Sequence, residues 1–105
     1  MDKNSKIYIA GHNGMVGSAI LNLLKSEGFR NIIVKSSTDL DLRNQNEVKV
    51  FFEKENPEFV FLAAAKVGGI LANNSYKAEF LYDNMMIQNN VIHHAYKSGV
   101  KKLLF

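Results

Sequence analysis

The feature that most constrains the fold is a glycine-spaced turn between two different hydrophobic periodicities. A short β-branched and aromatic run at residues 6–10 stops at Gly11, and apolar residues recur at helical spacing from Met15 onward. Within this turn, Gly11, Gly14 and Gly17 follow G-x-x-G-x-x-G spacing. A strand, a tight turn and a helix in direct succession indicate a parallel α/β unit, because parallel strands are joined by crossover helices.

The same alternation continues along all 105 residues. We expect strands at 6–10, 31–34, 58–65 and 101–105, and helices from Met15 to Gly28, from Asn44 to before Pro57, and over about 76–98. The first helix is expected to bury a stripe of apolar residues made of Val16, Ala19, Ile20, Leu23 and Leu24. The run at 58–65 is almost wholly apolar, which predicts a strand covered on both faces.

This β-α-β-α-β-α-β order predicts a doubly wound parallel sheet with right-handed crossovers. With the first strand central, we expect the fourth strand to lie beside it, in the middle of the sheet. The chain would then stop at Phe105 in mid-strand at the core of the sheet, so we expect it to be truncated.

Composition disfavours several other classes of protein. The absence of cysteine excludes a disulfide scaffold, a thiolate zinc site and a cysteine nucleophile within this span. Thirteen basic and ten acidic residues leave a net charge of +3 without a basic run, which does not support nucleic-acid binding. Apolar runs are too short to cross a membrane and no secretory signal is recognisable, so we expect a cytoplasmic protein.

The glycine turn is the strongest candidate for a binding site. Glycines permit an unusual backbone conformation, close approach of a diphosphate to the backbone, and tight packing of the helix start. The helix N-terminus adds free N–H groups and partial positive charge. We predict that the turn binds a dinucleotide through Gly11, His12, Asn13, Gly14, Met15, Val16 and Gly17. The alternative is a structural turn that binds nothing.

The residues after the second strand bear on which dinucleotide fits. NAD sites usually have a carboxylate there for the ribose 2′-hydroxyl, whereas residues 35–38 read K-S-S-T. A cation and hydroxyls favour a 2′-phosphate, so we predict NADP, with Lys35 and Ser36 as contacts. A strand boundary a few residues later would instead bring Asp39 to the ribose and favour NAD.

Three further groups of residues are candidates or alternatives. Asp41 and Leu42 are predicted at the adenine, where Asp41 accepts from the amino group or else only helps to cap the next helix. The small residues Ala63, Ala64 and Ala65 end the third strand and would let a cofactor lie against the backbone, unless they are ordinary packing. The adjacent histidines at 93–94 are expected on a helix surface, and we predict no metal site.

Three motifs at these separations resemble the GDP-L-fucose synthases, a family of extended short-chain dehydrogenases/reductases. They are G-H-N-G-M-V-G-S-A at 11–19, L-A-A-A-K-V-G-G-I-L-A-N-N at 62–74 and N-M-M-I-Q-N-N at 84–90. The first motif alone would indicate only the superfamily, and the other two narrow it to this family. The family often has arginine at Asn13 and near Ser37, so Lys35 would be the compensating cation here.

The resemblance implies that residues 1–105 are the N-terminal part of an NADP-binding Rossmann domain, whose smaller C-terminal substrate domain is absent. It implies epimerisation of GDP-4-keto-6-deoxy-mannose at C3 and C5, then reduction at C4 with NADPH. It also implies a homodimer formed partly through the helix at 76–98, and the wide apolar surface of that helix agrees.

The family's catalytic Tyr-x-x-x-Lys motif is missing from this span. The four tyrosines of the chain are followed, four positions later, by His12, Phe80, Met86 and Val100, and none of these is lysine. We therefore expect no catalytic residue here and no substrate turnover by the 105 residues alone. Two alternatives stay open: part of an NAD-dependent nucleotide-sugar epimerase or dehydratase, and a non-catalytic dinucleotide-binding module.

Overall fold

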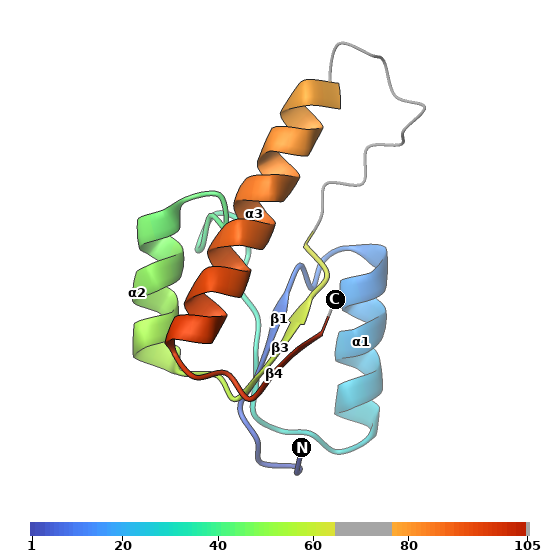
Figure 1. The fold of residues 1–105 in the computed structure, drawn as a ribbon. Coiled ribbons are helices and arrows are strands. Elements are labelled where there is room, and N and C mark those ends of the chain that lie inside the picture. Colours follow the sequence, from blue (N-terminus) through green and yellow to red (C-terminus); the bar gives the residue numbers. More distant parts are fainter. Residues whose placement is uncertain (65–76, 105) are drawn as a thin grey trace.

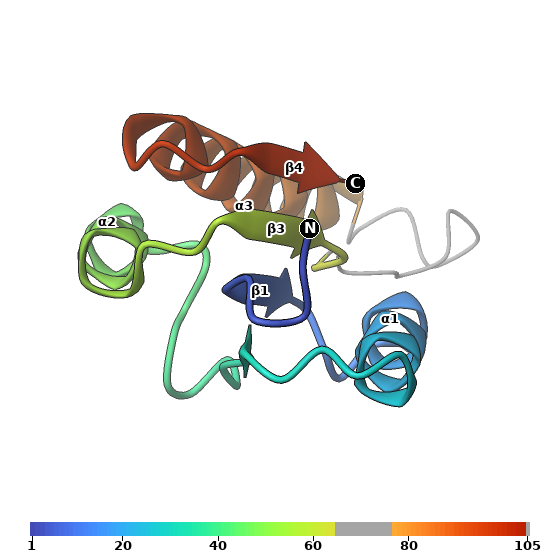
Figure 2. The ribbon, with the colours of Figure 1, turned by 90° about the horizontal axis from the view of Figure 1, so that it is seen from below.

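The computed structural model describes residues 1–64 and 77–104, which form a parallel sheet with helices on both faces (Figure 1). The elements follow the predicted order: β1 (Ile7–Ala10), α1 (Met15–Ser26), β2 (Ile32–Ile33), α2 (Gln45–Glu55), β3 (Phe59–Leu62), α3 (Lys77–Lys97) and β4 (Lys102–Leu104). Helix α1 lies on one side of the sheet, and α2 and α3 lie on the other (Figure 2). The predicted α/β class is confirmed.

The strand order is β2-β1-β3-β4, and all neighbouring pairs are parallel. Strand β4 pairs with β3 at an edge of the described sheet, so the prediction that it lies beside the first strand is wrong. Strand β1 has no free side, because β2 occupies one and β3 pairs along the other from Ile7↔Phe59 to Ala10↔Leu62. The chain therefore places β2 on one side of β1 and the later strands β3 and β4 on the other side, so the order of strand placement reverses between β1 and β3.

Strands β2 and β3 are each at least two residues shorter than predicted. The pairing of β2 covers Ile32–Ile33, where we expected 31–34, and β3 ends at Leu62, where we expected the strand to reach residue 65. After Leu62 the chain keeps one more contact with β1, since the Ala63 N–H donates to the Ala10 carbonyl at 2.9 Å.

Strand β1 divides the core into two layers by the alternation of its side chains. Ile7 and Ile9 belong to the cluster on the α1 side, whereas Tyr8 belongs to the larger cluster beneath α2 and α3. The Tyr8 ring packs against Phe51 and Phe52 of α2, with ring centroids 4.5 and 6.0 Å apart. Such tilted and edge-on contacts are the preferred geometry of buried aromatic rings.

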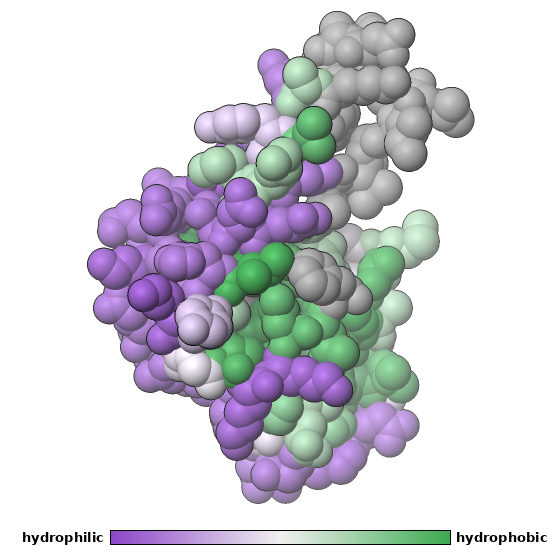
Figure 3. Space-filling model, in the orientation of Figure 1, coloured by the Kyte–Doolittle hydropathy of each residue, from purple (hydrophilic) through white to green (hydrophobic). Residues whose placement is uncertain are grey.

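Strand β3 is fully covered on only one face. Val60 and Leu62 are buried beneath α2 and α3, while Phe59 and Phe61 on the α1 side are half-buried. The difference arises because α1 packs on β1 rather than over the β3–β4 half of the sheet. In Figure 3 hydrophobic surface gathers over α1 and the neighbouring strands, and the α2 side is hydrophilic.

The buried face of α1 differs from the predicted stripe. Gly17 and Leu24 are buried, with Ile20 and Leu21 packed beside the sheet, whereas Val16, Ala19 and Leu23 are exposed. Gly17 decides this orientation, because it is the position at which the helix backbone comes close to the glycine turn. The apolar residues of α1 cover a wide arc of the helix, so the sequence was compatible with burial of either of two neighbouring faces.

The predicted ends of the helices are confirmed. The Asn44 side chain accepts from the Glu47 N–H at 3.1 Å at the start of α2, which ends at Glu55 before a left-handed Asn56. Gly28 follows α1 with a φ of +91°, and Gly99 follows α3 with a φ of +79°. Glycine is favoured at such positions because a side chain makes positive φ costly.

Substitution of two adjacent leucines separates the observed face of α1 from the predicted one. Leu24 is 6% exposed and Leu23 is 60% exposed. Leu24→Ala should lower the free energy of unfolding by roughly 2–4 kcal/mol, since it leaves a cavity against Ile7 and Ile9. Leu23→Ala should change it by less than about 0.5 kcal/mol. Urea denaturation followed by circular dichroism measures both, and equal losses would contradict the observed face.

Candidate functional site

The candidate site is a cavity of about 500 Å³ at the carboxyl ends of β1, β2 and β3. The strands are parallel, but the order in which the chain adds them to the sheet reverses between β1 and β3, which places the cavity where doubly wound sheets form their ligand crevice. It is lined by Gly11, His12, Asn13, Gly14, Lys35, Ser37, Thr38, Leu40, Asp41, Leu42, Arg43, Ala64 and Ile87.

Gly11 and Gly17 are required by the packing of the turn itself. Gly11 has a φ of +91°, and a Cβ there would lie 2.6 Å from the Cα of Ala64. A Cβ on Gly17 would overlap the carbonyl oxygen of Gly11. The turn, the end of β3 and the first turn of α1 can therefore meet only if neither position has a side chain.

Gly14 has a different role, because the protein leaves space for a side chain there. Its φ of −78° is ordinary, and the nearest atom to an added methyl group would be the Gly11 oxygen at 3.6 Å. Gly14 is the N-cap of α1 and makes no side-chain cap, and the first turn has no acidic residue. The glycine thus leaves the positive end of the helix open toward the cavity.

Not every predicted residue of the turn reaches the cavity. His12 and Asn13 line it together with the first two glycines, while Met15, Val16 and Gly17 do not. The side chains of Met15 and Val16 point into solvent on the exposed face of α1. What these three residues can offer a ligand is the set of backbone N–H groups in the first helical turn, which lack partners within the helix.

The loop after β2 brings Lys35, Ser37 and Thr38 to the cavity. Ser36, which we predicted as a contact, is not in the lining: its hydroxyl bonds to that of Thr38 at 3.1 Å and accepts from the Asp39 N–H at 3.3 Å. Ser36 therefore shapes the loop. Asp39 lies outside the lining as well and borders a separate hollow beside α2, so the one carboxylate among the cavity residues is Asp41.

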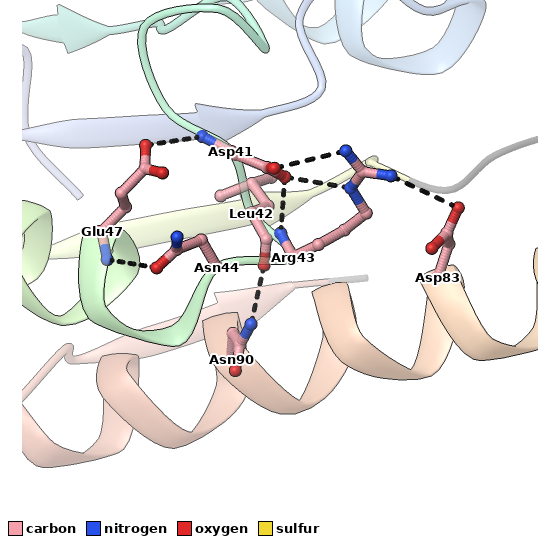
Figure 4. Close-up of polar contacts among 7 residues, drawn as sticks. All are labelled: Asp41, Leu42, Arg43, Asn44, Glu47, Asp83 and Asn90. Carbon is pink, nitrogen blue, oxygen red and sulfur yellow. Dashed lines mark hydrogen bonds and ion pairs between the residues drawn. The ribbon is translucent and has the colours of Figure 1, made fainter.

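Arg43 is the functional candidate that sequence reasoning missed. Its Nε and Nη2 donate to the two carboxylate oxygens of Asp41 at 3.1 and 3.2 Å, and its Nη1 lies 3.7 Å from a carboxylate oxygen of Asp83 on α3 (Figure 4). The hydrogen bonds to Asp41, and then the charges of Asp41 and Asp83, raise the pKa of Arg43. The D-x-R spacing was the only available signal.

The Asp41 side chain holds Arg43, accepting from its guanidinium and from its backbone N–H at 3.0 Å in the turn before α2. Asn44 caps α2, and the Glu47 carboxylate accepts instead from the backbone N–H of Asp41 at 3.2 Å (Figure 4). On the other side, the buried Asn90 of α3 donates to the Leu42 carbonyl at 2.9 Å. This loop is thus fastened both to α2 and to α3, and the adenine contact of Asp41 and Leu42 stays a prediction.

The end of β3 contributes one small residue to the lining. The backbones of Ala63 and Ala64 both lie close to Gly11, but of the two only Ala64 borders the cavity. Ala65, the third small residue predicted to let a cofactor approach the backbone, lies outside the described residues. Among the tyrosines that the structure describes, none borders the cavity. Tyr8 is in the core, where burial raises the pKa of its hydroxyl.

Two other properties of the described residues bear on the kind of site. No group of three or more histidine, aspartate or glutamate side chains is placed to hold a metal ion in residues 1–64 and 77–104. No helix in the same ranges is long and apolar enough to span a membrane. His94 is buried, at 7% exposure, so its predicted place on the helix surface is wrong, while His93 is exposed as expected.

Comparison with known proteins identifies the family. The model of the NAD dependent epimerase/dehydratase family matches residues 7–105. The chain belongs to this family. GDP-L-fucose synthase 1 of Arabidopsis thaliana is 57% identical over 104 residues, which are 99% of this chain and 32% of that protein.

Solved structures of family members have the same fold. One named DdhaC is 64% identical with a TM-score of 0.96, and the match covers 100% of this chain and 30% of the DdhaC chain. MlghC, a GDP-mannoheptose C4 reductase from Campylobacter jejuni with NADP bound, is 50% identical with a TM-score of 0.93 over 98% of this chain and 32% of its own. The chain thus spans about a third of the length of these relatives.

The different demands on two glycines give a test that needs no ligand. Gly17→Ala should lower the free energy of unfolding by about 2–3 kcal/mol, because the new methyl group would collide with the Gly11 carbonyl. Gly14→Ser should change it by less than about 0.5 kcal/mol, since there is space and serine is a good N-cap. Urea denaturation measures both, and a Gly17→Ala protein as stable as the parent would contradict this packing.

Proposed function

We propose that the chain is the N-terminal, NADP-binding part of a GDP-sugar reductase of the GDP-L-fucose synthase type. The observation that carries the proposal is the open N-terminus of α1 at Gly14, at the point of the parallel sheet where the strand order reverses. The family match supports a dinucleotide, and a relative 50% identical has NADP bound.

Different residues of the cavity bind different parts of the dinucleotide. The diphosphate lies against the backbone of Gly14 and the first-turn N–H groups of α1, where it meets the positive helix end. The 2′-phosphate lies at Lys35, Ser37 and Thr38, beyond the β2 end. NADP is favoured over NAD because Lys35 is a cation in this wall, whereas Asp41, the one carboxylate among the described lining residues, is held by Arg43.

The chemistry of the whole enzyme is the finer part of the proposal. Bound NADPH supplies a hydride for C4 of a GDP-4-keto sugar, after epimerisation at C3 and C5 in an enzyme of the GDP-L-fucose synthase type. The groups that move protons lie outside the 105 residues, so the chain alone should turn over no substrate. A cytoplasmic location, where GDP-sugars and NADPH would be available, belongs to the same proposal.

A second candidate is a GDP-heptose C4 reductase. It is favoured by the relative named as a GDP-mannoheptose C4 reductase, which is 50% identical to this chain. Both candidates share the cofactor site and the reduction at C4, and they differ in the sugar and in epimerisation. Assay of the full-length enzyme with GDP-4-keto-6-deoxy-mannose and with a GDP-4-keto-heptose, with NMR of the products, separates them.

Charge reversal at Lys35 tests the cofactor. We expect NADPH to bind the chain at least about tenfold more tightly than NADH, because the 2′-phosphate gains a charged partner. Lys35→Glu should remove most of that preference while leaving NADH binding nearly unchanged. Isothermal titration calorimetry measures both affinities.

The matched control is Lys25→Glu in the last turn of α1, which changes the net charge equally but lies outside the cavity lining. If the two variants weakened NADPH binding equally, the effect of Lys35 would be one of net charge and not of a specific contact. Tighter binding of NADH than of NADPH to the parent chain would overturn the choice of cofactor, and binding of neither would favour a module without a dinucleotide site.

A homodimer through α3 is part of the same proposal. The helix exposes a stripe of large apolar side chains away from the sheet, made of Leu81, Tyr82, Met85, Ile92 and Tyr96. Met85→Glu should convert the full-length dimer to monomer, because burying a carboxylate in an apolar interface is costly. Light scattering after gel filtration measures the mass. Val50→Glu, at an exposed apolar position of α2, is the control and should leave the dimer intact.

A further inference from the structure

A second cavity, of about 530 Å³, lies between α2 and the C-terminal end of α3. Among the described residues, it shares no lining residue with the cofactor cavity. It is lined by Gln45, Lys49, Phe52, Glu53, His93, His94, Lys97 and Ser98. We call it the α2–α3 groove.

His94 is the unusual residue of this groove. It is 7% exposed, and its Nε2 is the one buried side-chain nitrogen or oxygen without a hydrogen-bond partner in the part of the chain that the structure describes. Its ring meets that of His93 edge-on, with centroids 4.9 Å apart. His94 lines the groove and its buried Nε2 has no partner among the described residues, so we look for a partner that these residues do not supply.

The charges around His94 decide the sign of that partner. Lys97 and His93 on its own helix and Lys49 on α2 are basic, and Glu53 on α2 is the one acidic residue in the lining. Burial, and then the charges of His93, Lys49 and Lys97, lower the pKa of His94, and Glu53 opposes them only in part. The groove by itself therefore disfavours the protonated form of His94.

The available donors fit a ligand with several acceptor oxygens. Two ammonium groups, two imidazoles and the Gln45 amide can all donate, whereas a cation would find one carboxylate. A metal ion is disfavoured as well, since the described residues contain no cluster of three side chains able to ligate one.

We propose that the α2–α3 groove binds a small tetrahedral oxyanion, of the phosphate or sulfate kind, through Lys49, Lys97 and Nε2 of His94. The anion completes the hydrogen bonding of the buried imidazole and offsets the positive charge of the groove. Inorganic phosphate and the terminal phosphate of a phosphate monoester share this chemistry.

Binding should be coupled to proton uptake. A bound anion favours the protonated form of His94, so it raises the pKa of His94 from the lowered value that the protein alone imposes. Affinity for an anion of constant charge should therefore increase as the pH falls from neutral toward the pKa of His94. Sulfate is the suitable probe, because its charge stays constant between about pH 5.5 and 7.5, where imidazoles titrate.

The experiment is a sulfate titration of the chain followed by NMR of its histidine side chains. The three histidines separate the two cavities, since His12 reports on the cofactor cavity and His93 and His94 report on the groove. We expect saturable shifts of the His94 signals, with affinity about threefold or more tighter at pH 5.5 than at pH 7.5. Sodium chloride at matched ionic strength should not reproduce them.

Paired variants test the residues. Lys49→Ala with Lys97→Ala should weaken sulfate binding at His94 about fivefold or more, because both ammonium groups are lost. Lys25→Ala with Lys54→Ala removes the same charge from outside the groove and should have no comparable effect. His94→Gln should reduce the pH dependence, because His93 remains in the lining, and an unchanged helical circular dichroism spectrum shows that each variant is folded.

Two further probes distinguish the source of the anion. Inorganic phosphate that binds as sulfate does, with glycerol phosphate binding more weakly, indicates a free ion, and the reverse order indicates a phosphate monoester. Three results would overturn the proposal and leave water as the partner of Nε2. They are His94 shifts that do not saturate with sulfate, His94 shifts of the same size in sodium chloride, and equal weakening of sulfate binding by the two pairs of lysine substitutions. Shifts confined to His12 would place the anion in the cofactor cavity and also overturn it.

Discussion

The contact of three backbone segments at Gly11 is the constraint on which the rest of the structure depends. Gly11 touches the end of β3 at Ala64, and Gly17 touches the carbonyl of Gly11. No side chain fits at either contact, so the carboxyl end of β1, the end of β3 and the start of α1 are held within van der Waals distance. That closeness aims the N-terminus of α1 along the line between β1 and β3, where the sheet reverses its order.

The loop after β2 completes the cavity through polar contacts rather than packing. Arg43 joins Asp41 to Asp83, and Asn90 donates to the Leu42 carbonyl, so the loop is tied to α3 as well as to α2. The position of Arg43 and its neighbours therefore depends on α3, which includes Asn90, 48 residues after Leu42. Exposed ion pairs add little stability, so the main role of this network is to orient the cavity wall.

The distribution of apolar surface is uneven. Several apolar side chains of α1 are exposed and those on the α1 side of β3 are half-buried, while the side beneath α2 and α3 is packed. The stripe on α3, which points away from the sheet, is the surface that we assign to a second subunit.

The sequence by itself determined the local elements and the family. Periodicity, the glycine spacing and the Asn44 cap are properties of neighbouring residues, and the three motifs were long enough to identify the relatives. Tertiary structure alone decided that β4 lies at the edge beside β3, that α1 buries the Gly17 and Leu24 face, and that Asp41 holds Arg43. The physical reason is the same in each case: these features depend on which surfaces remain available once distant segments have packed, and a pattern of adjacent residues carries no record of that competition.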